Sequence, residues 1–442
     1  MPEKVSVIFA ILYVLSPTFY SHNFLIAFDV SVSVFALLSI LTLMVIYQSL
    51  INGENRLLEI HFIVFTFCLF VAISSKFSNL ILLPITIGTC TVIGFKLFKK
   101  KNISGLINFS LLTFSSLFAQ LFLIVFMYNW AFGKLTNKSI FDKIWVFIDG
   151  IKMNLSTAGG IREPFWNGDF VSITSLEYLV KTFWLKENPG LFMLGLFTFS
   201  ILIYTLTYQR QVIKNYINRQ NLPLIILGTA YPLIYFWLTK DSRFIIGYRY
   251  FYPIIVFVYL LIASLTVFLK HKWQKYVLLG GLTLYVYLGM LGIPQSLSYV
   301  NPLWNQEKWK LADDSTINWG QETEHGVEYL LTHKLLPKDN DNTITYQLFG
   351  VNIGFVQYLD LLTKIQDYPI NIQSYYAQSR FNPETETITQ LPHQYLLIDS
   401  TVKQKIYVQR ETNPIAAENW NFLSNNKPIY SRNDIIFIYK IS

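Results

Sequence analysis

The chain has 442 residues, of which 52% are hydrophobic, 17% aromatic and only 14% charged, a composition far from that of a soluble domain. It is therefore predicted to be an integral membrane protein. Its net charge of +8 is explained better by cytoplasmic lysine and arginine than by nucleic-acid binding. Cys68 and Cys90 both lie in apolar runs, so the polar segments have no cysteine with which to form a disulfide.

Apolar runs long enough to cross a hydrocarbon core of ~30 Å recur along the chain and predict about nine transmembrane helices. These runs cover residues 4–20, 26–48, 58–75, 79–97, 105–131, 189–208, 222–239, 251–269 and 276–293. The first run has one net cation before it and no small-residue cleavage pattern after it, so we interpret it as a retained helix.

Basic residues follow the fourth, sixth and eighth runs, and this arrangement places the three loops on the cytoplasmic side of the membrane. The three clusters are Lys96, Lys99, Lys100 and Lys101; Arg210, Lys214 and Arg219; and Lys270, Lys272 and Lys275. The N-terminus is then cytoplasmic, whereas the loop 132–188, the loop 240–250 and the tail 294–442 are extracytoplasmic.

Two of the external segments have patterns of their own. The stretch "FDKIWVFIDGIKMNL" in the loop 132–188 places its apolar residues on one helical face, which is typical of a helix in the membrane interface. The tail becomes polar after Pro294 and contains a predicted helix at about 320–336. Three strand-like runs in the tail are "TITYQLFG", "YLLIDS" and "IIFIYKI". The predicted fold is an α-helical polytopic membrane domain, residues 1–293, followed by a small extracytoplasmic α/β domain, residues 294–442.

Asp29 stands near the outer end of the second run, where a carboxylate costs a few kcal/mol on insertion scales and is usually kept for a function. It could hold a cation, accept a hydrogen bond from a sugar hydroxyl or act as a base. The alternative is a helix-start residue that interacts favourably with the helix N-terminus. His22 and Lys76 occupy neighbouring outer ends of runs and could face the same cavity, although lone residues of this kind are more often interfacial anchors.

The loop "KDSRFIIGYRYFYP" brings cations and tyrosines to the outer face of the membrane. Arg243, Arg249 and Tyr250 of this loop are candidates for binding a phosphate at headgroup level, because guanidinium groups and phenolic hydroxyls both donate hydrogen bonds to it. An aromatic belt with snorkelling cations is the alternative.

The external stretch "REPFWNGDF" contributes Glu163 and Asp169, beside an indole and an amide, and such groups are common where sugars bind. The same residues also form ordinary turns. The sequence contains no metal-ligand spacing, Walker loop, GxGxxG or GxSxG, so no nucleotide cofactor is predicted.

Several stretches together resemble the polyprenyl-phosphate-dependent GT-C glycosyltransferases, and their order carries the resemblance. They are "SPTFYSHNFLIAFDVSVSVFALLSI", "SSKFSNLILLPI", "EPFWNGDF" with "YLVKTFWLKENPGLFMLGLF", "YRYFYPI" and "DSTINWGQETEHGVEYL". The last closely resembles the "DSNLDWGQDLKRLAEYL" element that follows the final spans of many bacterial members. The most similar groups are dolichyl-phosphate-mannose-protein mannosyltransferase-like and aminoarabinose transferase-like proteins.

The resemblance implies transfer of a sugar from a polyprenyl-phosphate carrier to an extracytoplasmic acceptor, and a GT-C-like bundle in the plasma (inner) membrane of a bacterial cell. Asp29 matches a second acidic position that lines the cavity, where it would position the donor or a divalent cation. Arg249 and Tyr250 match an element near the lipid phosphate. The family's catalytic base belongs to an acidic loop between its first two spans, and this chain resembles the family from the third span onward.

Two other functions remain open at this stage. One is a non-catalytic or split paralogue that binds a polyprenyl phosphate or a glycan. The other is a transporter, which the span count and Asp29 would allow, although transporters tend to contain paired broken helices in two related halves and no such repeat is present.

Overall fold

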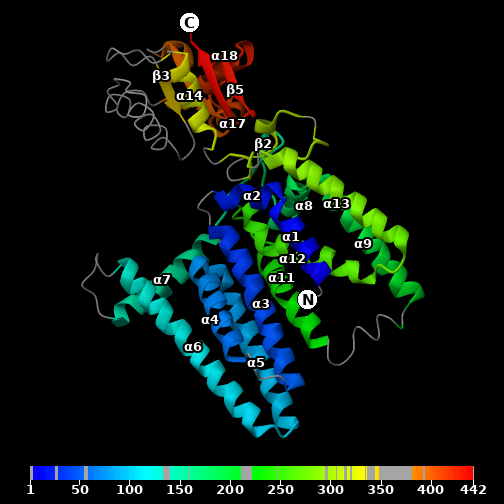
Figure 1. Cartoon of the computed structure of the whole chain (residues 1–442). Helices are drawn as coiled ribbons and strands as arrows, with labels where there is room; N and C mark the ends of the chain where they lie inside the picture. Colours follow the sequence, from blue (N-terminus) through cyan, green and yellow to red (C-terminus); the bar gives the residue numbers. More distant parts are fainter. Residues whose placement is uncertain are drawn as a thin grey trace.

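The structure is a computed structural model, and it describes residues 3–24, 28–53, 58–132, 140–158, 160–209, 211, 222–245, 247–293, 297–304, 306–312, 316–318, 321–333, 335, 344–347, 381–391 and 394–441. The chain is mostly helical, with a small region of helices and strands at its C-terminal end (Figure 1). In the described part, 7 helical segments are long and apolar enough to cross a membrane. The chain is therefore an integral membrane protein with multiple apolar helices.

Each of the 7 candidate spans coincides with a predicted apolar run. They are Val30–Leu50, Leu58–Ser75, Ser78–Lys99, Ile103–Ile124, Pro189–Tyr208, Tyr248–Phe268 and Lys272–Gly292. The helices that form them are α3 (Phe28–Asn52), α4 (Leu58–Ser75), α5 (Leu82–Lys99), α6 (Ile103–Phe132), α9 (Pro189–Tyr208), α12 (Tyr252–Leu265) and α13 (Lys272–Gly292). Short 3-10 helices extend two of these spans: η1 (Phe77–Ile81) precedes α5, and η2 (Tyr248–Phe251) and η3 (Thr266–Phe268) flank α12. The predicted run 222–239 forms α11 (Leu222–Thr239), whose described side chains make up an apolar helix over Ile225–Thr239.

The prediction of one continuous helix over residues 4–20 is wrong. The chain forms α1 (Glu3–Val14) and then α2 (Pro17–Phe24), with a break at Leu15 and Ser16. The cause is Pro17, which has no N–H to donate into a continuing helix and suits the first position of a new one. With 12 residues, α1 is ~18 Å long, too short to cross the bilayer by itself.

The candidate spans differ in how much of their surface lies inside the protein. In the most apolar stretch of Tyr248–Phe268, 61% of the residues are buried, against 17% in Ile103–Ile124. α12 is therefore a central helix, whereas α6 lies at the periphery and exposes 71% of Phe114 and 63% of Phe118. Apolar side chains exposed in this way are suited to lipid contact, because lipid tails are as apolar as the side chains themselves.

The predicted interfacial helix forms as α7 (Ile140–Ala158), which projects away from the bundle at the end of α6 (Figure 1). It exposes large apolar residues, including Trp145, Met153 and Leu155. It is followed by a hairpin of two short strands, β1 (Phe165–Trp166) and β2 (Asp169–Phe170). The next element is the helix α8 (Ser175–Lys186), which the sequence analysis did not predict. Gly168 occupies the turn of the hairpin with a φ of 97°, which a residue with a side chain rarely adopts.

The C-terminal region contains a four-stranded sheet in the order β3-β4-β6-β5. Its strands are β3 (Ile344–Gln347), β4 (Tyr395–Asp399), β5 (Tyr430–Arg432) and β6 (Ile436–Lys440). β3 runs parallel to β4, and the other two pairs are antiparallel. The three predicted strand runs and the predicted helix, which is α14 (Thr323–Thr332), are confirmed; β5, α17 (Ser400–Gln409) and α18 (Pro414–Asn425) were not predicted.

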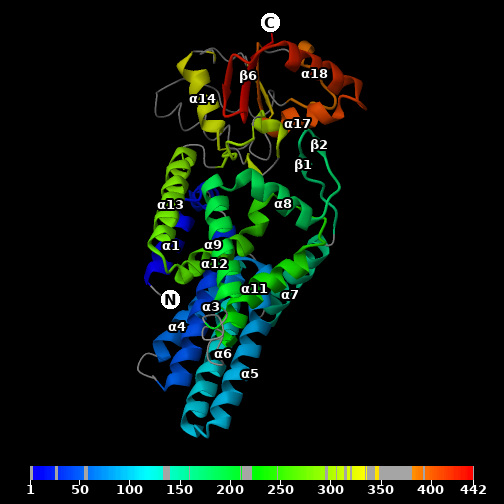
Figure 2. The same cartoon turned by 90° about the vertical axis from the view of Figure 1, so that its right-hand side faces the viewer.

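Alternation along the strands gives this sheet two apolar faces. Leu396, Ile398 and Phe437 pack with residues of α17 and α18 in one buried cluster. The opposite face meets α14, where a Cβ built on Gly326 would lie 2.8 Å from Ile436 Cδ1, so glycine allows this close approach. Figure 2 shows α14 on one side of the strands and the other two helices on the other side.

The C-terminal region is joined to the helical body by a buried cluster of its own. The cluster consists of Leu185, Leu311, Ala312, Ile317 and Ile435, with Trp166, Val300 and Trp304 packed against it. The two parts therefore share a continuous apolar interface at the C-terminal end of α8.

The lysine-rich connection between α5 and α6 lies at the end of the bundle farthest from the C-terminal region (Figure 1). Lys99, Lys100 and Lys101 are all exposed there.

Candidate functional site

Two of the predicted site residues meet where η1 and η2 begin their spans. Lys76, between α4 and η1, places its Nζ 4.7 Å from the centroid of the Tyr250 ring in η2. A cation over an aromatic face is attracted by the ring quadrupole. Tyr235 of α11 donates a hydrogen bond of 3.1 Å to the backbone oxygen of Tyr250, so three separate segments fix this contact.

Arg249 lies inside the same short turn, half-buried between Tyr248 and Tyr250. Gly247 precedes the turn with a φ of 92°, which favours glycine, and its carbonyl accepts a hydrogen bond from Tyr250 N. The turn therefore places Arg249 directly before Tyr250, the residue that Lys76 contacts.

Asp29 is the second residue of α3, and its position relative to Lys76 follows from Asn79 of η1. The Asn79 amide donates to the backbone oxygens of Val32 (3.1 Å) and Ala72 (3.0 Å), and its oxygen accepts the hydroxyl of Tyr231 (2.6 Å). Val32 is three residues after Asp29, so the first turn of α3 lies beside η1. The side chains of Asp29 and His22, the latter in α2, lie outside the described residues, and a divalent cation at Asp29 stays a prediction.

The other predicted site residues occupy the loops near this end of the bundle. Arg243 is exposed, and its backbone oxygen accepts a hydrogen bond of 3.0 Å from Arg162 N, which joins the two external loops. Glu163 is exposed; Asp169, also exposed, accepts a hydrogen bond from Phe170 N within the hairpin. Within the described residues, none of these three side chains forms a hydrogen bond, ion pair or ring contact with Lys76 or Tyr250.

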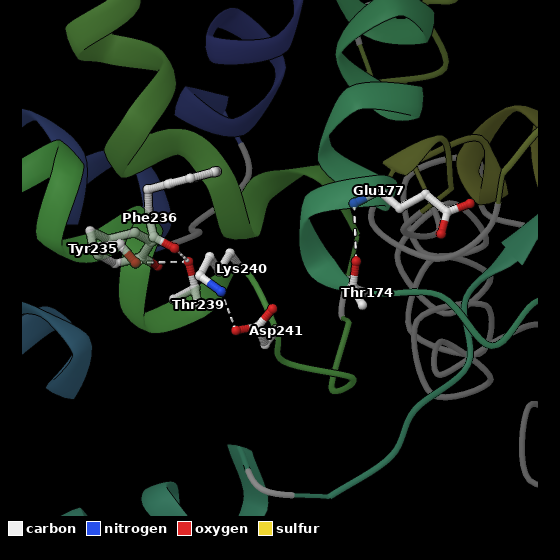
Figure 3. Close-up of polar contacts among 7 residues, drawn as sticks. All are labelled: Thr174, Glu177, Tyr235, Phe236, Thr239, Lys240 and Asp241. Carbon is white, nitrogen blue, oxygen red and sulfur yellow. Dashed lines mark hydrogen bonds and ion pairs between the residues drawn. The ribbon is translucent and has the colours of Figure 1, made fainter.

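The start of α8 is held against the loop that follows α11, because Ser175 N donates to Ser242 O over 2.9 Å and Leu176 N to Lys240 O over 3.1 Å. Figure 3 shows polar contacts within each of these two segments. Thr174 caps α8 by accepting a hydrogen bond from Glu177 N, and Thr239 donates to Tyr235 O. Lys240 forms an ion pair with Asp241, so one of the three external cations of this loop already has an anionic partner.

A buried polar cluster at the junction of α8 and α9 was missed by the sequence analysis. It consists of Lys186, Glu187 and Asn188, each at most 1% exposed. Asn188 caps α9 by accepting a hydrogen bond from Gly190 N, and its amide donates to Tyr285 O, both over 2.8 Å. In the sequence, these three polar residues before Pro189 look like an ordinary helix start. That pattern predicts the cap by Asn188 but not the buried contacts of Lys186 and Glu187.

Glu187 is the acceptor for two tyrosines from different parts of the chain. Tyr248 donates to Oε1 over 2.7 Å, and Tyr259 donates to Oε2 over 2.6 Å. Tyr259 also lies 3.0 Å from Ser16 Oγ, at the break between α1 and α2. Burial raises the pKa of the Glu187 carboxyl, and the two tyrosine hydrogen bonds oppose that rise.

Lys186 fixes the chain that leaves α13. Its Nζ donates to the backbone oxygens of Leu297 and Tyr299, each over 2.7 Å. Burial lowers the pKa of Lys186 to about 7, with a further contribution from the charge of Lys308, while the charge of Glu187 opposes the change.

The stretch "DSTINWG" links the helical body to the C-terminal sheet. Thr316 shares a 2.8 Å hydrogen bond with the Tyr178 hydroxyl and accepts one from Tyr248 N. Two residues later, the Asn318 amide donates to Asp399 Oδ2 and Thr401 Oγ1. In the described residues this motif is a structural link, and it reaches the Arg249 turn through Tyr248.

Comparison of the chain with protein-family profiles, curated proteins and solved structures returns no match in any of the three. The conclusions on function therefore depend on the residues themselves and on their arrangement.

Proposed function

We propose that the chain is a membrane glycosyltransferase, which moves a sugar from a polyprenyl-phosphate carrier to a protein, lipid or glycan acceptor outside the cytoplasm. The ordered motifs that resemble GT-C enzymes motivate the proposal. The observation that carries it is the contact of Lys76 with Tyr250, because it joins a cation and a phenol from segments far apart in sequence, and Arg249 is the neighbour of Tyr250 in the same turn.

The location of this contact suits a lipid carrier. Both η1 and η2 lie at the start of candidate spans, Ser78–Lys99 and Tyr248–Phe268, where lipid headgroups would lie. Two cations at this depth can bind a phosphate whose polyprenyl chain remains in the bilayer. Asp29, one helical turn before the carbonyl that binds Asn79, is close enough along α3 to act on the sugar of the same donor.

In the proposed reaction an acceptor oxygen attacks the anomeric carbon of the sugar while the bond from that carbon to the phosphate oxygen breaks. The phosphate leaves with the bonding electrons, and the acceptor proton passes to a base. Lys76 and Arg249 would stabilise the negative charge of the leaving phosphate, and Asp29 would position the donor or a divalent cation. The resemblance assigns the base to an acidic loop outside the part of the family that this chain resembles.

The proposed orientation follows the positive-inside rule. The exposed lysines between α5 and α6 face the cytoplasm, and the C-terminal region, at the other end of the bundle, is extracytoplasmic. In a bacterial cell the membrane would be the plasma (inner) membrane.

Asp29→Asn and Arg249→Ala are each expected to lower kcat/KM for sugar transfer about 100-fold, because each removes a charge that acts on the donor or the leaving phosphate. The measurement is transfer from synthetic polyprenyl-phosphate sugars by the purified full-length protein. Arg410→Ala, at the end of α17, removes an arginine from the C-terminal region and is expected to leave transfer unchanged.

Wild-type transfer rates in both Asp29→Asn and Arg249→Ala would remove these residues from the site. If the wild-type chain binds polyprenyl phosphate but transfers no sugar, the non-catalytic or split paralogue is correct. Absence of both binding and transfer would reject the proposed function.

A further inference from the structure

A hollow on the opposite end of the bundle has no part in the proposed reaction. It has a volume of about 440 Å³ and is lined by Thr91, Val92, Phe95, Lys96 and Lys99 of α5. These positions are three or four residues apart, so they share one face of the helix. The hollow therefore follows the last turns of α5 toward the lysine-rich connection to α6.

The two lysines lie at one end of this hollow, whose surface is otherwise apolar. Lys96 donates a hydrogen bond to the Tyr47 hydroxyl, and its Nζ lies 4.8 Å from the centroid of that ring. The Lys99 Nζ lies 4.6 Å from the centroid of the Phe95 ring. Within the described residues, no carboxylate forms an ion pair with either lysine.

The other end of the hollow is apolar and open to the bilayer. Val92 is 45% exposed and Phe95 57% exposed. From Thr91 to Lys99 the helix rises ~12 Å, which spans the distance from a phospholipid headgroup to the upper part of its acyl chains. A ligand that fills the hollow needs an anionic head beside Lys96 and Lys99 and an apolar tail beside Val92 and Phe95.

We propose that this hollow binds one anionic phospholipid of the surrounding leaflet. The phosphate lies between the Lys96 and Lys99 ammonium groups, where each offers hydrogen-bond donors and a positive charge. The first part of an acyl chain packs on Val92 and Phe95. A zwitterionic phospholipid brings its own cation to the lysines and binds more weakly.

The test is native mass spectrometry of the purified full-length protein with palmitoyl-oleoyl phosphatidylglycerol or with phosphatidylcholine of the same chains. The wild type is expected to retain phosphatidylglycerol in preference, and Lys96→Gln with Lys99→Gln to bind it about tenfold more weakly. The matched control is Lys272→Gln with Lys275→Gln, which removes two lysines at the start of α13, predicted to lie on the same side of the membrane. This control is expected to bind as the wild type does.

Lys99→Glu is a second test variant that should fold normally, because it leaves the contact of Lys96 with Tyr47 intact. It should still abolish the preference for phosphatidylglycerol over phosphatidylcholine. Soluble glycerol 3-phosphate distinguishes a lipid from a free phosphate: failure to displace the bound phosphatidylglycerol supports a lipid site, and full displacement overturns it. Equal losses in the α5 and α13 double variants, or equal retention of both lipids by the wild type, would also overturn the proposal.

Discussion

Glu187→Leu is expected to lower the free energy of unfolding by about 3–5 kcal/mol, an effect large enough to threaten folding. Leucine cannot accept the hydroxyls of Tyr248 and Tyr259. Within the described residues the buried Tyr248 hydroxyl is left without an acceptor, at a cost of about 1–3 kcal/mol, whereas the Tyr259 hydroxyl keeps Ser16 Oγ at 3.0 Å. The Lys186 ammonium would also lose the anion that favours its charged form. The measurement is the thermal unfolding midpoint of the full-length protein in detergent, followed by tryptophan fluorescence.

Glu177→Leu is the matched control, because it removes a glutamate from α8, the helix that ends directly before Glu187. The Glu177 carboxylate pairs with Lys181 over 2.8 Å, but its side chain is 50% exposed. Exposed pairs of this kind contribute about 0.3–0.5 kcal/mol, so the midpoint should hardly change. Equal midpoints for Glu187→Leu and Glu177→Leu would show that the buried cluster does not stabilise the fold.

Lys186→Met is expected to loosen the C-terminal region from the helical body and to cost about 3–5 kcal/mol. The two backbone oxygens of Leu297 and Tyr299 lose their common donor, and the Glu187 charge is left in the interior without a cation nearby. Faster proteolysis after α13, measured by mass spectrometry of the fragments, would report the loosening. Lys181→Met, which removes a half-buried lysine of α8 paired with Glu177, serves as the control and should digest at the wild-type rate.

The pH dependence of stability gives a second signature of Lys186. Burial lowers the pKa of this lysine to about 7 in the folded protein, from a model-peptide value of 10.5. Between these values the unfolded chain binds a proton that the folded chain does not, so the contribution of Lys186 makes the protein more stable as the pH rises. The wild type should therefore gain stability relative to Lys186→Met between about pH 7 and pH 10, and parallel pH profiles would contradict this assignment.

Hydropathy predicted most of the helical architecture, because the bilayer requires long apolar segments with internally bonded backbones. The short strand-like runs of the C-terminal region were equally informative, because helices cover both faces of this sheet and Leu396, Leu397 and Ile398 are all buried. The break before α2 was missed, although Pro17 was visible in the sequence. The prediction for residues 4–20 followed their apolar composition, but the missing N–H of Pro17 ended one helix and began the next.

The candidate site was predicted unevenly for a related reason. Lys76 and Tyr250 were both named from their positions at the outer ends of spans, and they do meet. Glu187 was not named, because its partners are 61 and 72 residues away and a glutamate before an Asn-Pro helix start raises no suspicion. Contacts of this range depend on the packing of α8, α9 and α12, which no local pattern encodes.

The attachment through Lys186 and Thr316 also affects what can reach the proposed site. Because the chain after α13 is held by a buried ammonium and the "DSTINWG" stretch is bonded to both Tyr178 and Tyr248, the C-terminal region is fixed at two points. A body fixed at two points can turn only about the line that joins them. Under the proposed function, this restraint limits how far the C-terminal region moves from the Arg249 turn, and with it the bulk of an acceptor that fits between them.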